Sequence, residues 1–170
     1  ENYFPFAHES GFNFSKKKVL EFTRKICATN SDKIFHNSTY DVGWLTHHGV
    51  PINGRIIDTM IVAPLIDENQ FWFSLNALGR EYINEGKSEG ELSAAAEEWG
   101  LDPKADMWRL PSAYVGTYAT QDAALTLKLW NHFKILLEEQ NLWNIFDLEM
   151  KVLPVVLAMK QQGVRVDVQR

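Results

Sequence analysis

The stretch KIFHNSTYDVGWL, residues 33–45, decides how the rest of the chain is interpreted. Its apolar pair Ile34-Phe35 suits the end of a short buried strand, and the polar residues that follow favour a turn. Asp41 then stands where a helix over residues 41–49 is expected to begin. Open α/β sheets bind ligands in the crevice beyond their strand ends, so a carboxylate at this place is a candidate functional residue.

A second candidate group lies in the stretch YATQD, residues 118–122. Tyr118 and Asp122 are four residues apart in an expected helix, so their side chains project from one face. Together with Asp41 they would place two carboxylates and a phenol in one cleft. Carboxylates bind hard cations such as Mg²⁺, and two such ions activate a water and stabilise the leaving oxygen of a phosphodiester.

Each of these motifs also has an ordinary structural explanation. Asp41 and Asp122 could be helix caps or solvated residues, and Tyr118 could belong to the core. For either motif alone we favour that explanation, whereas the two together in this order favour a metal site. Four carboxylates usually hold two metal ions, and these motifs provide two of them.

Composition limits the class of protein. With 170 residues, 45% of them hydrophobic, the chain is long enough for one domain with a real core. The single cysteine, Cys27, excludes an internal disulfide framework and a cysteine zinc site. A formal charge of -5 does not suit a general nucleic-acid binder, unless acidic groups surround metal ions and only a short strand end is held.

The pattern of apolar residues, caps and breakers predicts few strands among many helices. The expected helices cover residues 16–29, 41–49, 58–65, 74–82, 88–100, 111–140 and 142–162. Strands are expected at 33–36 and 55–57, with an edge strand at 3–6 and a new strand after Gly163. This predicts an α/β protein with a small sheet whose remaining strands lie upstream of Glu1, so that both ends of the chain are cut.

These motifs and their order resemble the 3'-5' proofreading exonuclease domain of family A DNA polymerases, most closely the phage-type enzymes. HNSTYD, residues 36–41, is similar to the second exonuclease motif, an Asn followed by an aromatic-Asp pair. Residues 118–122 are similar to the third, Tyr-x-x-x-Asp. Residues 148–167 resemble the junction that leads into a polymerase domain. The resemblance therefore divides the chain into an exonuclease domain at 1–140 and a junction with the start of a polymerase domain at 141–170.

The resemblance implies a ribonuclease-H-like 3'-5' exonuclease fold without its first strands, with a long C-terminal helix leading to the polymerase. It implies that Asp41 and Asp122 are ligands of two divalent metal ions, Mg²⁺ or Mn²⁺, and that Tyr118 positions the attacking water. Asn37 and His36 would lie near the terminal nucleotides. The implied reaction removes nucleotides from single-stranded DNA 3' ends, as the proofreading step of DNA replication.

Two further groups are candidate nucleic-acid contacts on residue type alone. Trp108 stands on the loop before the third motif, where it could stack on a base. The run Lys16-Lys17-Lys18 could contact a phosphate backbone, although a charge run at a helix start is more often solvated.

The sequence departs from the family pattern in one respect. The family's first motif, Asp-x-Glu, provides the other two metal ligands and is expected upstream of Tyr3. The one Asp-x-Glu in the chain, Asp147 to Glu149, stands in the expected C-terminal helix, where residues two apart point in different directions. We therefore expect residues 1–170 alone to be inactive.

Two alternatives to an active proofreading domain remain open. The chain could be a non-catalytic exonuclease-like platform for a polymerase, or an RNA-trimming ribonuclease of the same superfamily. The presence of Asn37, Asp41, Tyr118 and Asp122 together argues against the first, and the polymerase-like junction argues against the second.

The remaining expectations concern partners and location. The partners would be a single-stranded DNA 3' end and a polymerase domain in the same chain, with the protein a monomer. The sequence has neither a signal peptide nor an apolar run that could cross a bilayer, so the cytoplasm is expected, the host's if the source is a phage.

Overall fold

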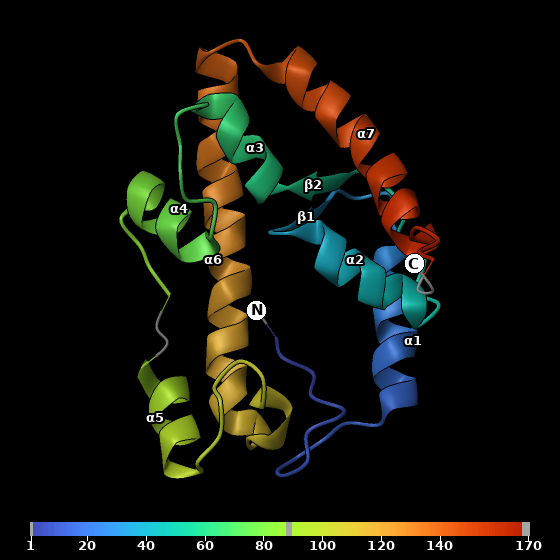
Figure 1. The fold of residues 1–170 in the computed structure, drawn as a ribbon, viewed down its shortest axis with the longest axis vertical. Coiled ribbons are helices and arrows are strands. Elements are labelled where there is room, and N and C mark those ends of the chain that lie inside the picture. The colour runs from blue at the N-terminus through green and yellow to red at the C-terminus, as the bar shows by residue number, and fades with distance from the viewer. Residues whose placement is uncertain (1, 88–89, 168–170) are drawn as a thin grey trace.

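The computed structural model describes residues 2–87 and 90–167, and most of them are helical (Figure 1). The helices are α1 (Lys16–Cys27), α2 (Ser38–His47), α3 (Thr59–Ile66), α4 (Leu75–Ile83), α5 (Gly90–Glu98), the 3₁₀ helix η1 (Met107–Arg109), α6 (Ser112–Glu139) and α7 (Trp143–Gln162). Two short strands, β1 (Lys33–Phe35) and β2 (Ile56–Asp58), complete the described elements. None of the helices in these ranges is long and apolar enough to cross a membrane.

The sheet is small and parallel. β1 and β2 pair with Lys33 opposite Ile56 and Phe35 opposite Asp58, and α2 forms the crossover between them. Because the strands are parallel, both end at the same edge, which is where α2 and α3 begin. The predicted strands at 33–36 and 55–57 are therefore present; the first ends one residue earlier than predicted, and the second is shifted by one residue as a whole.

The Asp58 carboxylate binds the beginnings of both helices. Its Oδ1 accepts hydrogen bonds from the backbone N–H of Met60 at 2.9 Å and of Asn37 at 3.0 Å. Its Oδ2 accepts from the Ser38 N–H at 2.6 Å and from the Ser38 hydroxyl at 2.7 Å. The predicted cap of α3 is confirmed, and α2 starts at Ser38 rather than at the predicted Asp41 because Asp58 caps it as well.

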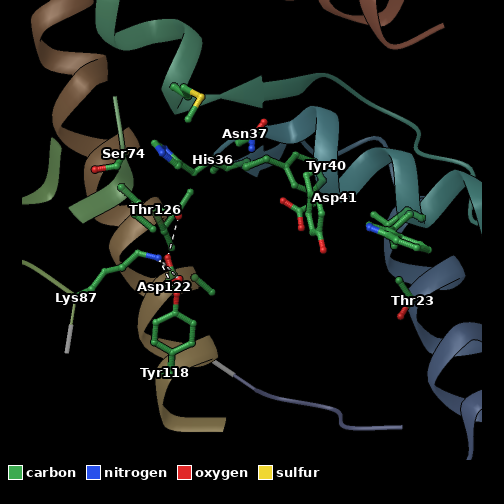
Figure 2. A pocket seen from close by; sticks show the side chains of 18 of the residues that line it. Thr23, His36, Asn37, Tyr40, Asp41, Ser74, Lys87, Tyr118, Asp122 and Thr126 are labelled. Carbon is green, nitrogen blue, oxygen red and sulfur yellow. Dashed lines mark hydrogen bonds and ion pairs between the residues drawn. The ribbon is translucent and has the colours of Figure 1, made fainter. Parts of the chain in front are cut away.

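Helix α6 runs along the long axis of the molecule, and the other elements of the core pack around it (Figure 1). Leu125, Leu129 and Phe133 are at most 2% exposed and lie in one core with residues of α3 and α4. The buried residues of α7 join the same core; they are Phe146, Met150, Leu153 and Leu157. This packing leaves the N-terminal half of α6, with Tyr118 and Asp122, to face the beginning of α2 (Figure 2).

Two predicted strands are wrong. Residues 3–6 form no strand. The Pro5 carbonyl oxygen accepts from the Phe14 N–H at 2.7 Å, and Tyr3 packs against a buried cluster that includes Leu110 and Val115. The His8 ring bonds to the Leu110 carbonyl oxygen at 2.8 Å, and the Glu9 N–H donates to the Trp108 carbonyl oxygen at 2.9 Å. Residues 163–167 are likewise not a strand, and the last part of that prediction, residues 168–170, lies outside the described residues.

We expect Asp58→Ala to destabilise the fold by about 2–4 kcal/mol, because two helix caps are lost at a site that is 2% exposed. Asp102→Ala is the matched control. Asp102 also accepts two backbone hydrogen bonds, from Lys104 and Ala105, but it is exposed, so we expect a much smaller loss of stability. Urea unfolding followed by circular dichroism measures both, and equal losses would contradict the double-cap role.

Candidate active site

One open pocket of about 1290 Å³ is lined by residues from both motifs. Asp41 reaches it from the first turn of α2, and Tyr118 and Asp122 reach it from α6 (Figure 2). His36 and Asn37, at the end of β1, line the same pocket. The structure therefore brings five of the six predicted site residues together.

The negatively charged form of Asp41 is disfavoured in this pocket. Its side chain remains accessible to solvent, yet the surrounding protein removes part of its hydration, and the Asp58 carboxylate lies near. Desolvation first, and repulsion by Asp58 second, raise the pKa of Asp41 from 3.8 to about 6. Near neutral pH the pocket therefore holds a carboxylate whose negative charge is poorly stabilised, which is a common property of functional carboxylates.

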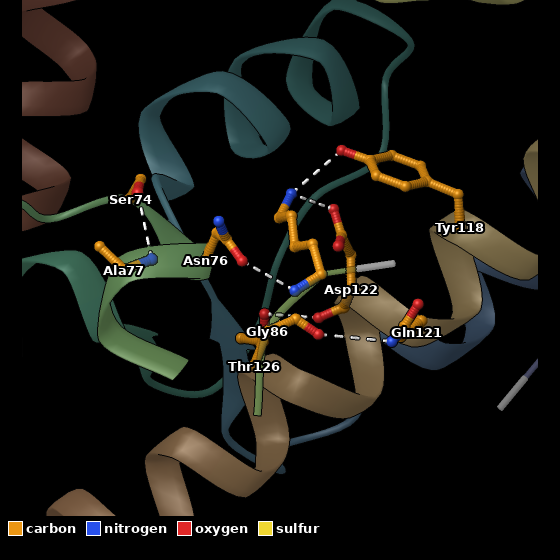
Figure 3. A network of polar contacts seen from close by, with 9 residues as sticks. Ser74, Asn76, Ala77, Gly86, Tyr118, Gln121, Asp122 and Thr126 are labelled. Atoms are coloured by element: carbon orange, nitrogen blue, oxygen red, sulfur yellow. Dashed lines mark hydrogen bonds and ion pairs between the residues drawn. The ribbon is translucent and has the colours of Figure 1, made fainter. Parts of the chain in front are cut away.

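Asp122 has a cationic partner, Lys87 (Figure 2), and Figure 3 shows Asp122 and Tyr118 within a wider network of polar contacts. The Lys87 ammonium donates to Asp122 Oδ2 at 2.5 Å and to the Tyr118 hydroxyl at 3.0 Å. The Lys87 and Asp122 side chains are only 16% and 23% exposed. Burial alone would lower the pKa of Lys87, but the hydrogen bonds to Asp122 and Tyr118 outweigh it, so this pKa is raised and the ammonium stays charged.

The sequence interpretation missed Lys87, which lies on the loop after α4, far from both motifs in the chain. Its backbone N–H donates to the Asn76 side-chain oxygen at 2.9 Å, which fixes the loop beside α4. Gly86 permits this approach, because a Cβ there would lie 2.9 Å from the same oxygen. A glycine followed by a lysine was the only local signal in the sequence.

The other oxygen of Asp122 is not the one that Lys87 binds. Asp122 Oδ1 is buried and has no hydrogen-bond partner among the described residues. A carboxylate oxygen in this state suits a hard divalent cation, and Asp41 contributes a second carboxylate to the same pocket. Within residues 2–87 and 90–167, no three His, Cys, Asp or Glu side chains are grouped closely enough to hold a metal ion. Asp41 and Asp122 are therefore of the right chemical type to bind such a cation, and they form part of a ligand set.

His36 faces the pocket as a neutral ring. Its Nδ1 bonds to the Thr59 hydroxyl at 2.9 Å, and its Nε2 is buried without a partner among the described residues. Burial lowers the pKa of His36 more strongly than the nearby Asp58 raises it. Asn37 has the left-handed backbone conformation that Asn tolerates, with φ of 66°, and this turns the chain from β1 into α2.

Two other acidic or aromatic candidates lie elsewhere. Trp108, the sixth predicted site residue, lines a separate cavity of about 200 Å³ beside Tyr3 and His8. Asp147 of the Asp-x-Glu in α7 forms an exposed ion pair with Arg55 at 3.0 Å, and neither Asp147 nor Glu149 lines the pocket. Conversely, Trp44 and Lys104 do line the pocket, and the sequence interpretation singled out neither.

Comparison with known proteins identifies the class. A family model described as 3'-5' exonuclease matches residues 7–138, so the chain belongs to this family and the resemblance found in the sequence is confirmed.

The relatives are DNA polymerases. The chain is 35% identical to a DNA-directed DNA polymerase of Pseudomonas phage M6, over 99% of this chain and 26% of that protein. It is 31% identical to the DNA polymerase DpoZ of Salmonella phage PMBT28, over 78% of this chain and 22% of that protein. It is 24% identical to DNA polymerase I of Synechocystis, over 97% of this chain and 16% of that protein. The chain thus spans about a quarter of its relatives or less.

The raised pKa of Asp41 predicts how stability depends on pH. Between pH 3.8 and about 6 the folded protein keeps a proton on Asp41 that the unfolded chain releases, so this residue's contribution to stability falls as the pH rises through that window. We expect Asp41→Asn to be more stable than the unsubstituted protein at about pH 7, and the difference to shrink at about pH 4.5. Urea midpoints at the two pH values measure this, and a difference that does not change with pH would contradict it.

The Lys87 contact predicts a link between stability and cations. We expect Lys87→Met to lose about 1–3 kcal/mol, because the Asp122 carboxylate is left without its partner. Mn²⁺ should stabilise this variant more than the unsubstituted protein, because the competing ammonium is gone. The matched control is Lys128→Met, which breaks an exposed pair with Glu85 on the same loop. Equal responses of the two variants to Mn²⁺, in urea unfolding against a chelator, would contradict the prediction.

Proposed function

We propose that this chain is the 3'-5' proofreading exonuclease domain of a family A DNA polymerase, and that it removes nucleotides from single-stranded DNA 3' ends with the help of divalent metal ions. The observation that carries the proposal is the single pocket lined by Asp41, Tyr118 and Asp122. Membership of the exonuclease family and the polymerase relatives support it. With phage proteins among those relatives, the site of action proposed is the host cytoplasm.

In this proposal Asp41 and Asp122 hold divalent cations, Mg²⁺ or Mn²⁺. Such ions, when bound, provide a water that ionises near neutral pH and stabilise the leaving oxygen of a phosphodiester. Asp122 offers the buried Oδ1 that has no partner among the described residues, and Asp41 offers an accessible carboxylate that gains from a nearby positive charge. Two metal ions need about four carboxylates, and the resemblance assigns the other two to an Asp-x-Glu motif on a strand that precedes Tyr3.

Tyr118 positions the attacking water. Its hydroxyl lies 3.0 Å from the Lys87 ammonium, which donates to it and so leaves the phenolic hydrogen free to point towards a water or a phosphate. Lys87 binds Asp122 at the same time, so one cation orients both side chains. In this proposal His36 and Asn37, which line the same pocket just after β1, contact the terminal nucleotide.

The domain arrangement is also proposed from the family. The fold would be the ribonuclease-H-like one, with residues 1–140 as the exonuclease domain and 141–170 as the junction with the polymerase domain. Helix α7 shares its core with α6, through residues such as Phe146 and Leu137, so a junction here would be rigidly attached to the exonuclease domain.

One observation favours a second candidate, a non-catalytic platform. The Lys87 ammonium already neutralises Asp122, and an ion pair of this kind is also expected in a purely structural domain. The two candidates differ in whether Asp122 is needed for chemistry.

The test uses the longest natural polypeptide that contains these residues, with a 5'-labelled single strand and Mg²⁺. We expect Asp122→Asn to slow removal of 3' nucleotides by more than about 100-fold, because a direct metal ligand is lost, while nucleotide addition continues. Asp147→Asn, on the exposed face of α7, is the control and should cleave normally. Unchanged cleavage in Asp122→Asn would contradict the proposal, and faster cleavage of an RNA strand would favour a ribonuclease.

A further inference from the structure

We propose that a surface formed by Phe4, Phe12, Phe14 and Phe22, here called the phenylalanine patch, is a docking site for an acidic peptide segment of a partner protein, with a bulky apolar residue as its anchor. The inference goes beyond the proposed function, because none of these four rings lines the carboxylate pocket. The patch joins the N-terminal segment to α1, which stands at one side of the molecule (Figure 1).

The four rings form one continuous apolar surface. Phe4 lies between Phe14 and Phe22, whose ring centroids are 5.9 Å and 5.2 Å from its own. The Phe12 ring centroid is 4.8 Å from that of Phe14. Between 39% and 65% of each residue is exposed. A contiguous apolar surface that remains exposed, with polar residues at its rim, is typical of an interaction site.

Helix α1 leaves part of its apolar side exposed next to this surface. All residues of α1 are described, and Cys27 alone among them is buried. Ile26, one turn after Phe22, is 49% exposed and extends the patch along the helix. A helix of 12 residues gains most of its stability from the packing of an apolar face, so this face would gain from a cover.

The charge around the patch is positive, although the protein is acidic. Helix α1 carries five basic residues and one acidic residue, whereas the whole chain has a formal charge of -5. Lys18 stands four residues before Phe22 and Lys25 three residues after it, so both lysines lie on the face of this ring. The first turn of α1, all of it described, has no acidic residue to compensate its lysines. Charge complementarity therefore favours a partner with carboxylates around its apolar residue.

The geometry of the patch suits a peptide better than a nucleic-acid strand. Neighbouring rings are inclined to one another by 58° to 86°, so they do not offer the parallel faces on which successive bases stack. Phe4 also lines the cavity of about 200 Å³, together with Trp108. A cavity of about 150 Å³ holds a benzene molecule, so this one has room for an aromatic or large aliphatic anchor. Trp108 thereby takes part in anchoring a peptide in this proposal.

The probe is a fluorophore-labelled peptide, Glu-Glu-Asp-Phe-Leu-Glu-Glu, added to the longest natural polypeptide that contains these residues. We expect Phe22→Ser to weaken its binding by about 10-fold or more, because an apolar contact is lost. Lys18→Glu should weaken binding by a similar factor and make it less sensitive to salt, because a charge contact is lost. Phe22→Leu, which keeps an apolar side chain, should restore most of the affinity.

Fluorescence anisotropy measures these affinities at about 0.1 M and about 1 M salt, between which the Debye length falls from about 10 Å to about 3 Å. The matched controls are Phe71→Ser and Lys151→Glu, because Phe71 is 87% exposed, Lys151 is also exposed, and neither belongs to the patch. Circular dichroism checks that each variant is folded. Lys18→Glu replaces an exposed side chain, so it keeps the test decisive if Phe22→Ser unfolds.

Any of five results would overturn the proposal. They are no binding of the peptide, equal binding of a peptide with lysine at each acidic position, equal affinity in Phe22→Ser and Phe71→Ser, displacement of the peptide by (dT)₆, and a dimer in sedimentation that Phe22→Ser abolishes. Cover of the patch by another part of the polypeptide gives the first result, a nucleic-acid occupant the fourth, and a second copy of the chain the fifth.

The outcome is separate from that of the proposed function. Asp122→Asn should bind the peptide with unchanged affinity, because Asp122 lies in the carboxylate pocket and outside the patch. Phe22→Ser should degrade a single strand as fast as the unsubstituted protein. Unimpaired cleavage in Asp122→Asn would contradict the proposed function alone, whereas loss of peptide binding in the same variant would contradict the separate position of the patch.

Discussion

The structure depends on one buried carboxylate, that of Asp58, which binds the backbone at the start of two helices. These hydrogen bonds join the end of β1 to the end of β2 and start α2 at Ser38. Asp41 therefore lies in the first turn of α2, where it faces the pocket instead of serving as the cap itself. Desolvation is the main cause of the raised pKa of Asp41, and the Asp58 carboxylate that this arrangement places nearby raises it further.

The two carboxylates of the pocket are stabilised differently. Lys87 compensates Asp122 directly and also binds the phenol of Tyr118, which gives these α6 side chains defined positions before any ligand arrives. The pKa of Asp41, by contrast, is raised, and its side chain is exposed to solvent. Functional sites commonly retain such unfavourable charge, because a bound cation or substrate then compensates it. The Lys87 ammonium is a cation shared between the Asp122 carboxylate and the Tyr118 phenol.

Local patterns predicted the long helices well and the junctions less well. The apolar spacing and the breakers around α6 and α7 placed both helices within about two residues of their ends, because these signals lie inside the elements themselves. The start of α2 was wrong because its cap comes from Asp58, on the next strand. The strand expected at residues 3–6 was wrong because Tyr3 packs against the cluster of Leu110 and Val115, and the residues that follow bond to η1 and to the loop before α6. In each case the deciding group is distant in sequence.

The sequence by itself determined the family, the candidate trio of Asp41, Tyr118 and Asp122, and the helical character of the chain, because motif spacing and apolar periodicity are local properties. Only the tertiary structure decided that these residues share one pocket, that Lys87 bridges two of them, and that Trp44 borders the same space while Trp108 does not. Such facts follow from how α2, α6 and the loop after α4 pack around one core, and contacts between distant segments leave no periodic mark on either segment.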